Sequence, residues 1–330
     1  MWQMRSMLTR RVAFASAALL PFAGRGARAQ DQSFARFVDG VMAEARRAGI
    51  HDATLRAAFA GVAPNSRVIE LDRNQPEFKL TWPEYRAKVL PESRIQLARQ
   101  NFARQRDLLR DVRRRFAVDP AVIMGIWGIE SNFGSTKGNY RLVEALSTLA
   151  WEGRRASYFR KELLNALRIL DSGDVGPARL TGGWAGAMGQ PQFMPSSYLT
   201  YAVDFDGDGR RDIWDSLPDV FGSIANYMAR SGWRDGAPSA QPVQVPASID
   251  SAIANRDDRR PLGAWMEMGV RRDDGSPFSR SDVQGALIIP TGVAPGQGFM
   301  VYPNFNAIRR YNPSDFYALA VSLLGDAAVI

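Results

Sequence analysis

A single acidic residue at the end of an apolar helix constrains this chain most. Asp119-Pro120 is typical of a helix start, with a capping side chain followed by proline at the first helical position. Residues 121 to about 132 are apolar or glycine on nearly every side, which predicts a helix buried all round. Glu130 is the only acid in this run and falls in its last turn. The fold must therefore hold one carboxyl in an apolar setting.

Both features of this position favour the neutral form of the carboxyl. Burial disfavours a carboxylate, and so does the negative end of the helix dipole, so we expect a raised pKa for Glu130. A carboxyl of that kind suits general acid catalysis near neutral pH. The residues alone leave one alternative equally open: a structural glutamate paired with Arg154 or Arg155.

The rest of the chain predicts an α+β fold that is mainly α. Helical spacing recurs over residues 31–60, from Pro91 to about Phe116, and from Ser314 to Leu324, whereas residues 62–80 lack periodicity and are expected to be extended. Short apolar runs between turns predict strands from Ala237 to about Pro303. We expect five parts: a signal peptide (1–29), an N-terminal α domain (30–116), a catalytic core (117–236), a small antiparallel β-rich domain (237–303) and a C-terminal core segment with a helix (304–330).

The first 29 residues are expected to direct export. A basic start is followed by an apolar stretch, Val12 to Ala23, that is too short to span a bilayer. Ala27-Arg28-Ala29 then fits a cleavage site before Gln30. Residues 1–29 favour a periplasmic protein, and the choice between the Sec and twin-arginine routes stays open.

Composition excludes several kinds of chemistry. Five of the 42 Lys and Arg residues and none of the 34 acids lie in residues 1–29, so the net charge of +8 becomes 37 − 34 = +3 after cleavage. This charge does not indicate a nucleic-acid partner. The absence of cysteine excludes disulfides, thiolate nucleophiles and a lipidated cysteine, so we expect no membrane anchor. The only histidine, His51, lies beside an expected helix start and is read as a surface residue.

An acidic loop over residues 204–215 has the spacing of an EF-hand. Acids stand at positions 1, 3, 5, 9 and 12 and glycine stands at position 6. This spacing predicts a structural calcium ion, with no organic cofactor. The expected ligands are the carboxylates of four residues and one carbonyl: Asp204, Asp206, Asp208, Asp215 and the carbonyl of Arg210. An acidic turn without metal is the alternative.

Five motifs in order carry a resemblance to a known family. They are Glu130-Ser131-Asn132-Phe133-Gly134, Gly153 to Phe159, Trp184 to Tyr198, Asp204 to Gly209, and Arg310-Tyr311-Asn312. Together they resemble the membrane-bound lytic murein transglycosylase B family over about residues 34–324, here in a soluble periplasmic form. The resemblance implies a lysozyme-like helical core. It also implies an enzyme, most simply a monomer, that acts on peptidoglycan glycan strands and works beside wall-synthesis proteins.

The resemblance further implies a mechanism and a set of site residues. Glu130 would act as acid and then base on the MurNAc-β-1,4-GlcNAc bond, with help from the MurNAc acetamido group, to form 1,6-anhydroMurNAc. Family positions that line the sugar groove correspond to Tyr85, Ser131, Arg154, Arg155, Tyr158, Gln192, Tyr227, Tyr311 and Asn312. One departure stands out: the family usually has a serine that assists near the catalytic glutamate where this chain has Gly183. A hydrolytic muramidase and a non-catalytic peptidoglycan-binding scaffold remain the alternatives.

Overall fold

The computed structural model describes residues 23–74 and 80–330. The apolar stretch of the expected signal peptide lies outside these ranges, apart from its last residue, and the expected cleavage point falls within the first helix. The helices are α1 (Ala23–Arg47), α2 (Asp52–Phe59), α3 (Ser66–Arg73), α4 (Trp82–Val89), α5 (Glu92–Phe116), α6 (Pro120–Ser131), α7 (Leu142–Glu152), α8 (Ala156–Asp171), α9 (Pro195–Tyr201), α10 (Leu217–Arg230), α11 (Leu262–Glu267), α12 (Pro303–Tyr311) and α13 (Asp315–Val329).

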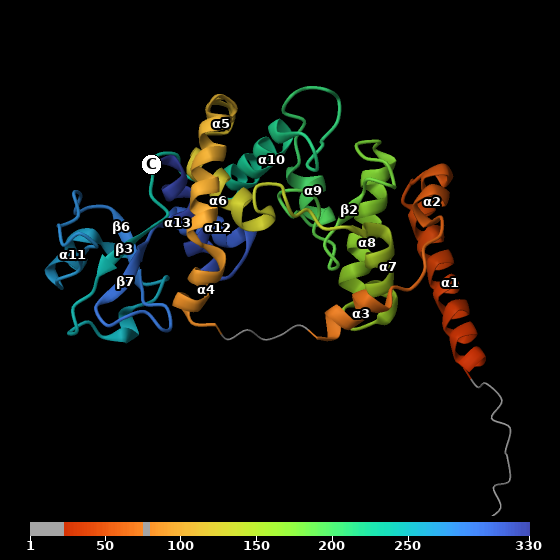
Figure 1. The fold of residues 1–330 in the computed structure, drawn as a ribbon, viewed down its shortest axis with the longest axis horizontal. Coiled ribbons are helices and arrows are strands. Elements are labelled where there is room, and N and C mark those ends of the chain that lie inside the picture. Colours follow the sequence, from red (N-terminus) through yellow and green to blue (C-terminus); the bar gives the residue numbers. More distant parts are fainter. Residues whose placement is uncertain (1–22, 75–79) are drawn as a thin grey trace, which may run out of the picture.

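The strands are few and short, so the expected α+β fold of mainly helical type is confirmed (Figure 1). They are β1 (Tyr140–Arg141), β2 (Thr181–Gly182), β3 (Ala240–Gln244), β4 (Arg260–Pro261), β5 (Arg271–Arg272), β6 (Gln284–Ile288) and β7 (Gln297–Val301). β1 and β2 form a two-stranded ribbon, and the other five form one antiparallel sheet in the order β4-β6-β7-β3-β5. Within this sheet Val301 of β7 stands between Ala240 of β3 and Ala286 of β6.

Three apolar clusters hold the described residues together. One joins α5, α6, α10, α12 and α13, a second joins α2, α3, α7 and α8 with part of α1, and a third lies between the sheet and α11. We call the five-stranded sheet and α11 together the β module. In Figure 1 the module, the α5–α6–α13 part and the α7–α8 part follow one another from left to right.

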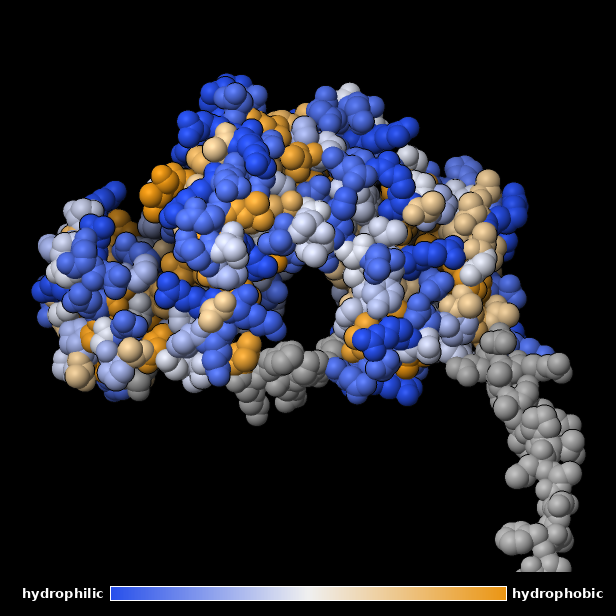
Figure 2. All heavy atoms as spheres, in the orientation of Figure 1, coloured by the Kyte–Doolittle hydropathy of each residue, from blue (hydrophilic) through white to orange (hydrophobic). Residues whose placement is uncertain are grey.

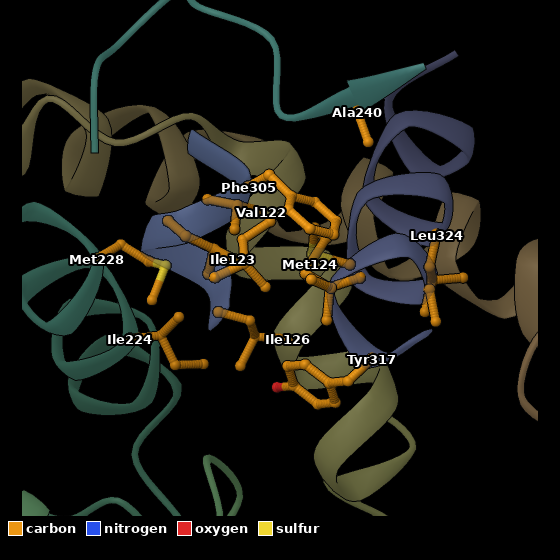
Figure 3. Packing of buried hydrophobic residues seen from close by; sticks show 14 of the residues in the cluster. Val122, Ile123, Met124, Ile126, Ile224, Met228, Ala240, Phe305, Tyr317 and Leu324 are labelled. Atoms are coloured by element: carbon orange, nitrogen blue, oxygen red, sulfur yellow. The ribbon is translucent and has the colours of Figure 1, made fainter. Parts of the chain in front are cut away.

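The helices α6 and α13 pack backbone against backbone. A Cβ on Gly125 would lie 2.2 Å from the carbonyl oxygen of Val321, and one on Gly325 would lie 2.2 Å from that of Ala121. Only glycine lets two helix backbones approach so closely. The paired residues run in opposite directions, so the helices are antiparallel, and Figure 3 shows the packing between them. The last turn of α6 therefore lies beside the first turn of α13.

The helix α3 corrects the expectation of an extended chain over residues 62–80. The side chain of Asn65 accepts hydrogen bonds from the backbone N–H groups of Arg67 and Val68, which caps the helix. Val68 and Asp72 are buried against the rest of the molecule. Eight residues with two inward side chains are too few to give a periodic signal, which is why the pattern was missed.

Candidate active site

Glu130 stands at a rigid helix end. After α6 the chain turns through three residues in the left-handed region, Asn132 (φ 47°), Phe133 (φ 57°) and Gly134 (φ 81°). The hydroxyl of Ser131 donates to the carbonyl of Trp127 (3.2 Å) and accepts from the N–H of Gly134 (3.0 Å). Ser131 is fully buried, so its expected role as a sugar contact is corrected: this hydroxyl is used to hold the turn.

The carboxyl of Glu130 has a hydroxyl partner and no charged one. The hydroxyl of Tyr317, in the first turn of α13, donates to Glu130 Oε1 at 2.6 Å. Burial raises the pKa of Glu130 to about 7, and the hydrogen bond from Tyr317 acts in the opposite direction. Among the described residues no cation forms an ion pair with this carboxyl. A pKa near the operating pH suits a group that first gives and then takes a proton.

The open alternative of a structural glutamate–arginine pair is overturned. Arg154 Nε lies 2.8 Å from Asp72 Oδ2 and Arg155 Nη2 lies 2.6 Å from Asp72 Oδ1. Asp72 comes from α3, and its two partners stand just before α8. Both arginines remain more than two-fifths exposed, so they can still meet a ligand with their free edges.

Tyrosines from three elements surround the Glu130 carboxyl. Burial raises the pKa of Tyr85, Tyr311 and Tyr317, and the charge of Glu130 raises each of them further. Such an electrostatic influence requires the hydroxyls to lie close to the carboxyl. Tyr85 belongs to α4, Tyr311 ends α12 and Tyr317 opens α13, so the site is assembled from both ends of the chain.

A second group of rings continues from Tyr311. The rings of Tyr311 and Tyr227 are 4.6 Å apart, and Tyr227 lies 4.2 Å from Tyr201. The hydroxyl of Tyr227 donates to the carbonyl of Arg310 at 2.6 Å, and that of Tyr311 donates to the carbonyl of Pro191. These bonds fix the rings. A row of fixed aromatic faces suits the apolar faces of sugars.

The remaining expected sugar contacts lie on several elements. Gln192 has φ 52°, and its amide donates to the carbonyls of Gly189 (2.7 Å) and Lys137 (3.4 Å). The side chain of Asn312 accepts from the N–H of Ser314 (3.1 Å), beside the start of α13. Tyr158 is 46% exposed on α8. Figure 2 shows the molecular surface hollowed between the α4–α5 part and the α3–α7–α8 part.

The acidic loop brings together only part of the expected metal site. Carboxylate oxygens of Asp204, Asp206 and Asp219 lie within 4.8 Å of one another. Asp219 is fully buried on α10, and burial raises its pKa to about 6. Asp208 accepts from the N–H of Arg210 and stays outside the cluster. Three carboxylates so close together repel one another, and a cation would relieve this repulsion.

Asp215, the expected ligand at position 12, faces elsewhere. Lys137 Nζ lies 2.8 Å from Asp215 Oδ1, and Arg179 pairs with the other oxygen. Asp219 replaces it in the cluster. Sequence reasoning missed Asp219 because it lies four residues beyond the twelve-residue loop. It also missed Tyr317, because nothing in the sequence pairs α13 with α6.

Known proteins resemble this chain along most of its length. The model of the transglycosylase SLT domain matches residues 33–326. Membrane-bound lytic murein transglycosylase B of Escherichia coli strain K12 is 35% identical over 262 residues, which are 76% of this chain and 68% of that protein.

Two solved structures extend the comparison. SltB3 from Pseudomonas aeruginosa, in complex with NAG-anhNAM-pentapeptide, has a TM-score of 0.86 and 44% identity over 90% of this chain and 80% of that one. Escherichia coli Slt35 in complex with calcium has a TM-score of 0.74 and 31% identity over 91% of this chain and 94% of that one.

The helical fold, with the Glu130 carboxyl at the end of α6, defines the class: an enzyme of the lytic transglycosylase type with a lysozyme-like core. The chain belongs to the family of the transglycosylase SLT domain. The resemblance seen in the sequence is thereby confirmed. None of the helices in residues 23–74 and 80–330 is long and apolar enough to cross a membrane.

Proposed function

We propose that the protein cleaves the MurNAc-β-1,4-GlcNAc bond of peptidoglycan glycan strands and releases 1,6-anhydroMurNAc ends, with Glu130 as its single acid and base. The observation that carries this proposal is the place of Glu130 in the last turn of the apolar helix α6, with the Tyr317 hydroxyl 2.6 Å from its carboxyl and burial raising its pKa to about 7. Within the described residues no second carboxylate influences Glu130. Most glycosidases use two carboxylates, one of which activates water or attacks the sugar. A lone carboxyl favours a route that needs neither an activated water nor an attacking carboxylate.

In the first step protonated Glu130 gives its proton to the glycosidic oxygen. The bond from C1 of MurNAc to that oxygen breaks, and the MurNAc acetamido oxygen bonds to C1 in its place. Glu130 is left as a carboxylate. The hydroxyl of Tyr317, 2.6 Å away, donates to this carboxylate and stabilises it after the transfer.

In the second step the Glu130 carboxylate takes the proton of the C6 hydroxyl of the same sugar. The C6 oxygen bonds to C1 as the acetamido oxygen leaves, which closes the 1,6-anhydro ring. Glu130 is protonated again, so no water is consumed and the enzyme is ready for another cycle. The row from Tyr311 to Tyr227 is proposed to hold the sugar rings, and Arg154 and Arg155 to meet carboxylates of the substrate.

We assign a structural calcium ion to the acidic loop. The cluster of Asp204, Asp206 and Asp219 fits a hard cation with oxygen ligands, and Asp208 and the carbonyl of Arg210 are close enough in the chain to complete the shell. The ion would tie the loop to α10, which also carries Tyr227. Export by residues 1–29 would place the enzyme in the periplasm, where peptidoglycan lies.

Product analysis tests the proposed reaction. Purified sacculi are digested with the wild type and with Glu130→Gln, and the muropeptides are analysed by mass spectrometry. The wild type should release anhydro products, lighter by one water than hydrolysis products, and the variant should release none. Reducing-end products would show a muramidase instead. Equal wall clearing by both proteins would reject the enzymatic role of Glu130 and favour a binding scaffold.

A further inference from the structure

A cavity between α4 and the β module lies outside the Glu130 site. It has a volume of about 750 Å³ and opens between α4 and the β module, where Figure 2 shows a recess. Its inner wall is apolar and includes Trp82, Leu90, Val243 and Phe299. This volume is within the range of small-ligand sites. The N–H of Trp82 donates to the carbonyl of Thr291 at 2.8 Å, which fixes α4 against the module, so the cavity is preformed.

The rim of the cavity carries one cation and one anion without partners. Arg86 stands on the exposed face of α4, and Asp273 stands in the turn after β5. Within the described part of the chain neither side chain forms an ion pair or a hydrogen bond through its charged group. A matching ligand has an apolar body, a carboxylate for Arg86 and an ammonium group for Asp273. A short peptide with a free carboxyl and a free amine has this chemistry.

The cavity and the active site share α4 as a common wall. Trp82 faces the cavity, whereas Tyr85, on the same helix, lies close to Glu130. Their rings are stacked with centroids 6.1 Å apart. A helix is about 10–12 Å across with its side chains. A five-residue peptide extends over roughly 17 Å, so a peptide attached to a sugar near Glu130 can cross the exposed face of α4 and end in the cavity.

We propose that this cavity binds the peptide stem of peptidoglycan, with Arg86 on a stem carboxylate and Asp273 on the free side-chain amine. The inference rests on the proposed function for the identity of the peptide. It assigns α4 a second role as the ridge over which the stem passes. The enzyme should therefore prefer glycan strands that carry their stems, and uncross-linked stems above those whose amine is already used in a cross-link.

Two measurements on the full-length mature protein test the site. In the first, the sugar-free stem pentapeptide is titrated into the wild type, Arg86→Ala and Asp273→Asn. Calorimetry gives the Kd of each protein, and NMR shows which residues the peptide affects. Loss of one charge-assisted hydrogen bond, about 1.5 kcal/mol, corresponds to a roughly tenfold weaker Kd. Acetylation of the peptide amine should weaken binding to the wild type and leave binding to Asp273→Asn unchanged. Arg104→Ala, an exposed arginine on α5 away from the cavity, is the matched control and should bind like the wild type.

The second measurement compares kcat/KM on stem-bearing strands with that on strands stripped of peptide by an amidase. Arg86→Ala and the cavity-filling Ala87→Trp should lower the ratio of the two values toward one while activity on stripped strands stays the same. The stem site would be overturned if the kcat/KM ratio were unchanged in Arg86→Ala and Ala87→Trp and the Kd were unchanged in Arg86→Ala and Asp273→Asn. Peptide-induced NMR shifts confined to Arg154 and Arg155 would also overturn it. A failure of the proposed function would give a different result, because no anhydro product would then form from either substrate.

Discussion

Replacement of Glu130 by glutamine should make the protein more stable at high pH. The folded-state pKa of this carboxyl is about 7, above its ordinary value of 4.5, so the native state binds the proton more tightly than the unfolded state. Between these two values the free energy of unfolding of the wild type must fall as pH rises. Glutamine has no proton to lose and keeps an oxygen that accepts from the Tyr317 hydroxyl, so the variant escapes this loss.

The size of the effect follows from the same two values. A difference of one in pKa corresponds to 1.36 kcal/mol, so the gap between 4.5 and about 7 gives about 3 kcal/mol by pH 8. Almost none of this difference exists at pH 4, which is below both values. The stability of Glu130→Gln relative to the wild type should therefore increase by about 3 kcal/mol between pH 4 and pH 8.

Urea unfolding at a series of pH values between 4 and 8 measures the difference, with calcium held constant. Glu267→Gln, which changes an exposed glutamate on α11, is the matched control and should follow the wild type at every pH. A Glu130→Gln curve that stays parallel to the wild-type curve over the whole range would refute the reasoning. The carboxyl would then be ionised in the native state and unable to serve as an acid at neutral pH.

Three further outcomes are expected. Tyr317→Phe removes the bond that lowers the pKa of Glu130, so the basic limb of the kcat–pH profile should move up by about one pH unit; an unmoved limb would contradict this. Calcium should raise the Tm of the wild type and of Asp215→Asn but not that of Asp204→Ala, as followed by thermal melts with calcium or chelator. Gly183→Ser should fold normally, because an added Cβ meets nothing nearer than 3.7 Å. If the family serine assists catalysis, the kcat of Gly183→Ser on sacculi should rise above that of the wild type. An unchanged kcat would show that another group already does the work of that serine in this chain.

The parts of the fold that the sequence predicts are those with a strong local signal. The long helix from Pro91 to Phe116 shows a periodic apolar face, and Asp119-Pro120 marks the start of α6 by its capping chemistry. The structure has both. The ribbon of β1 and β2 has no such signal, since each strand has two residues and exists only because Tyr140 and Arg141 meet a distant partner. Short elements that depend on tertiary contacts are missed for this reason.

The same distinction applies to the site. Glu130 is visible in the sequence because its apolar setting is local. Tyr317 is 187 residues away in the chain, and its approach to Glu130 depends on the glycine contacts between α6 and α13. Likewise, the loop spacing finds Asp204 and Asp206, whereas Asp219 joins them only through the packing of α10. Local chemistry predicts which group acts, and the fold decides which groups adjust it.

The central claim, that Glu130 deprotonates the sugar's own C6 hydroxyl, is tested most directly by the origin of the oxygen atom that becomes bonded to C1. Sacculi are digested by the wild type in water enriched in oxygen-18, and the released ends are analysed by mass spectrometry. A reaction in which Glu130 deprotonates the sugar's own C6 hydroxyl predicts anhydro ends without label. Incorporation of one labelled oxygen at C1 would show that water attacks instead, and would contradict the proposed mechanism.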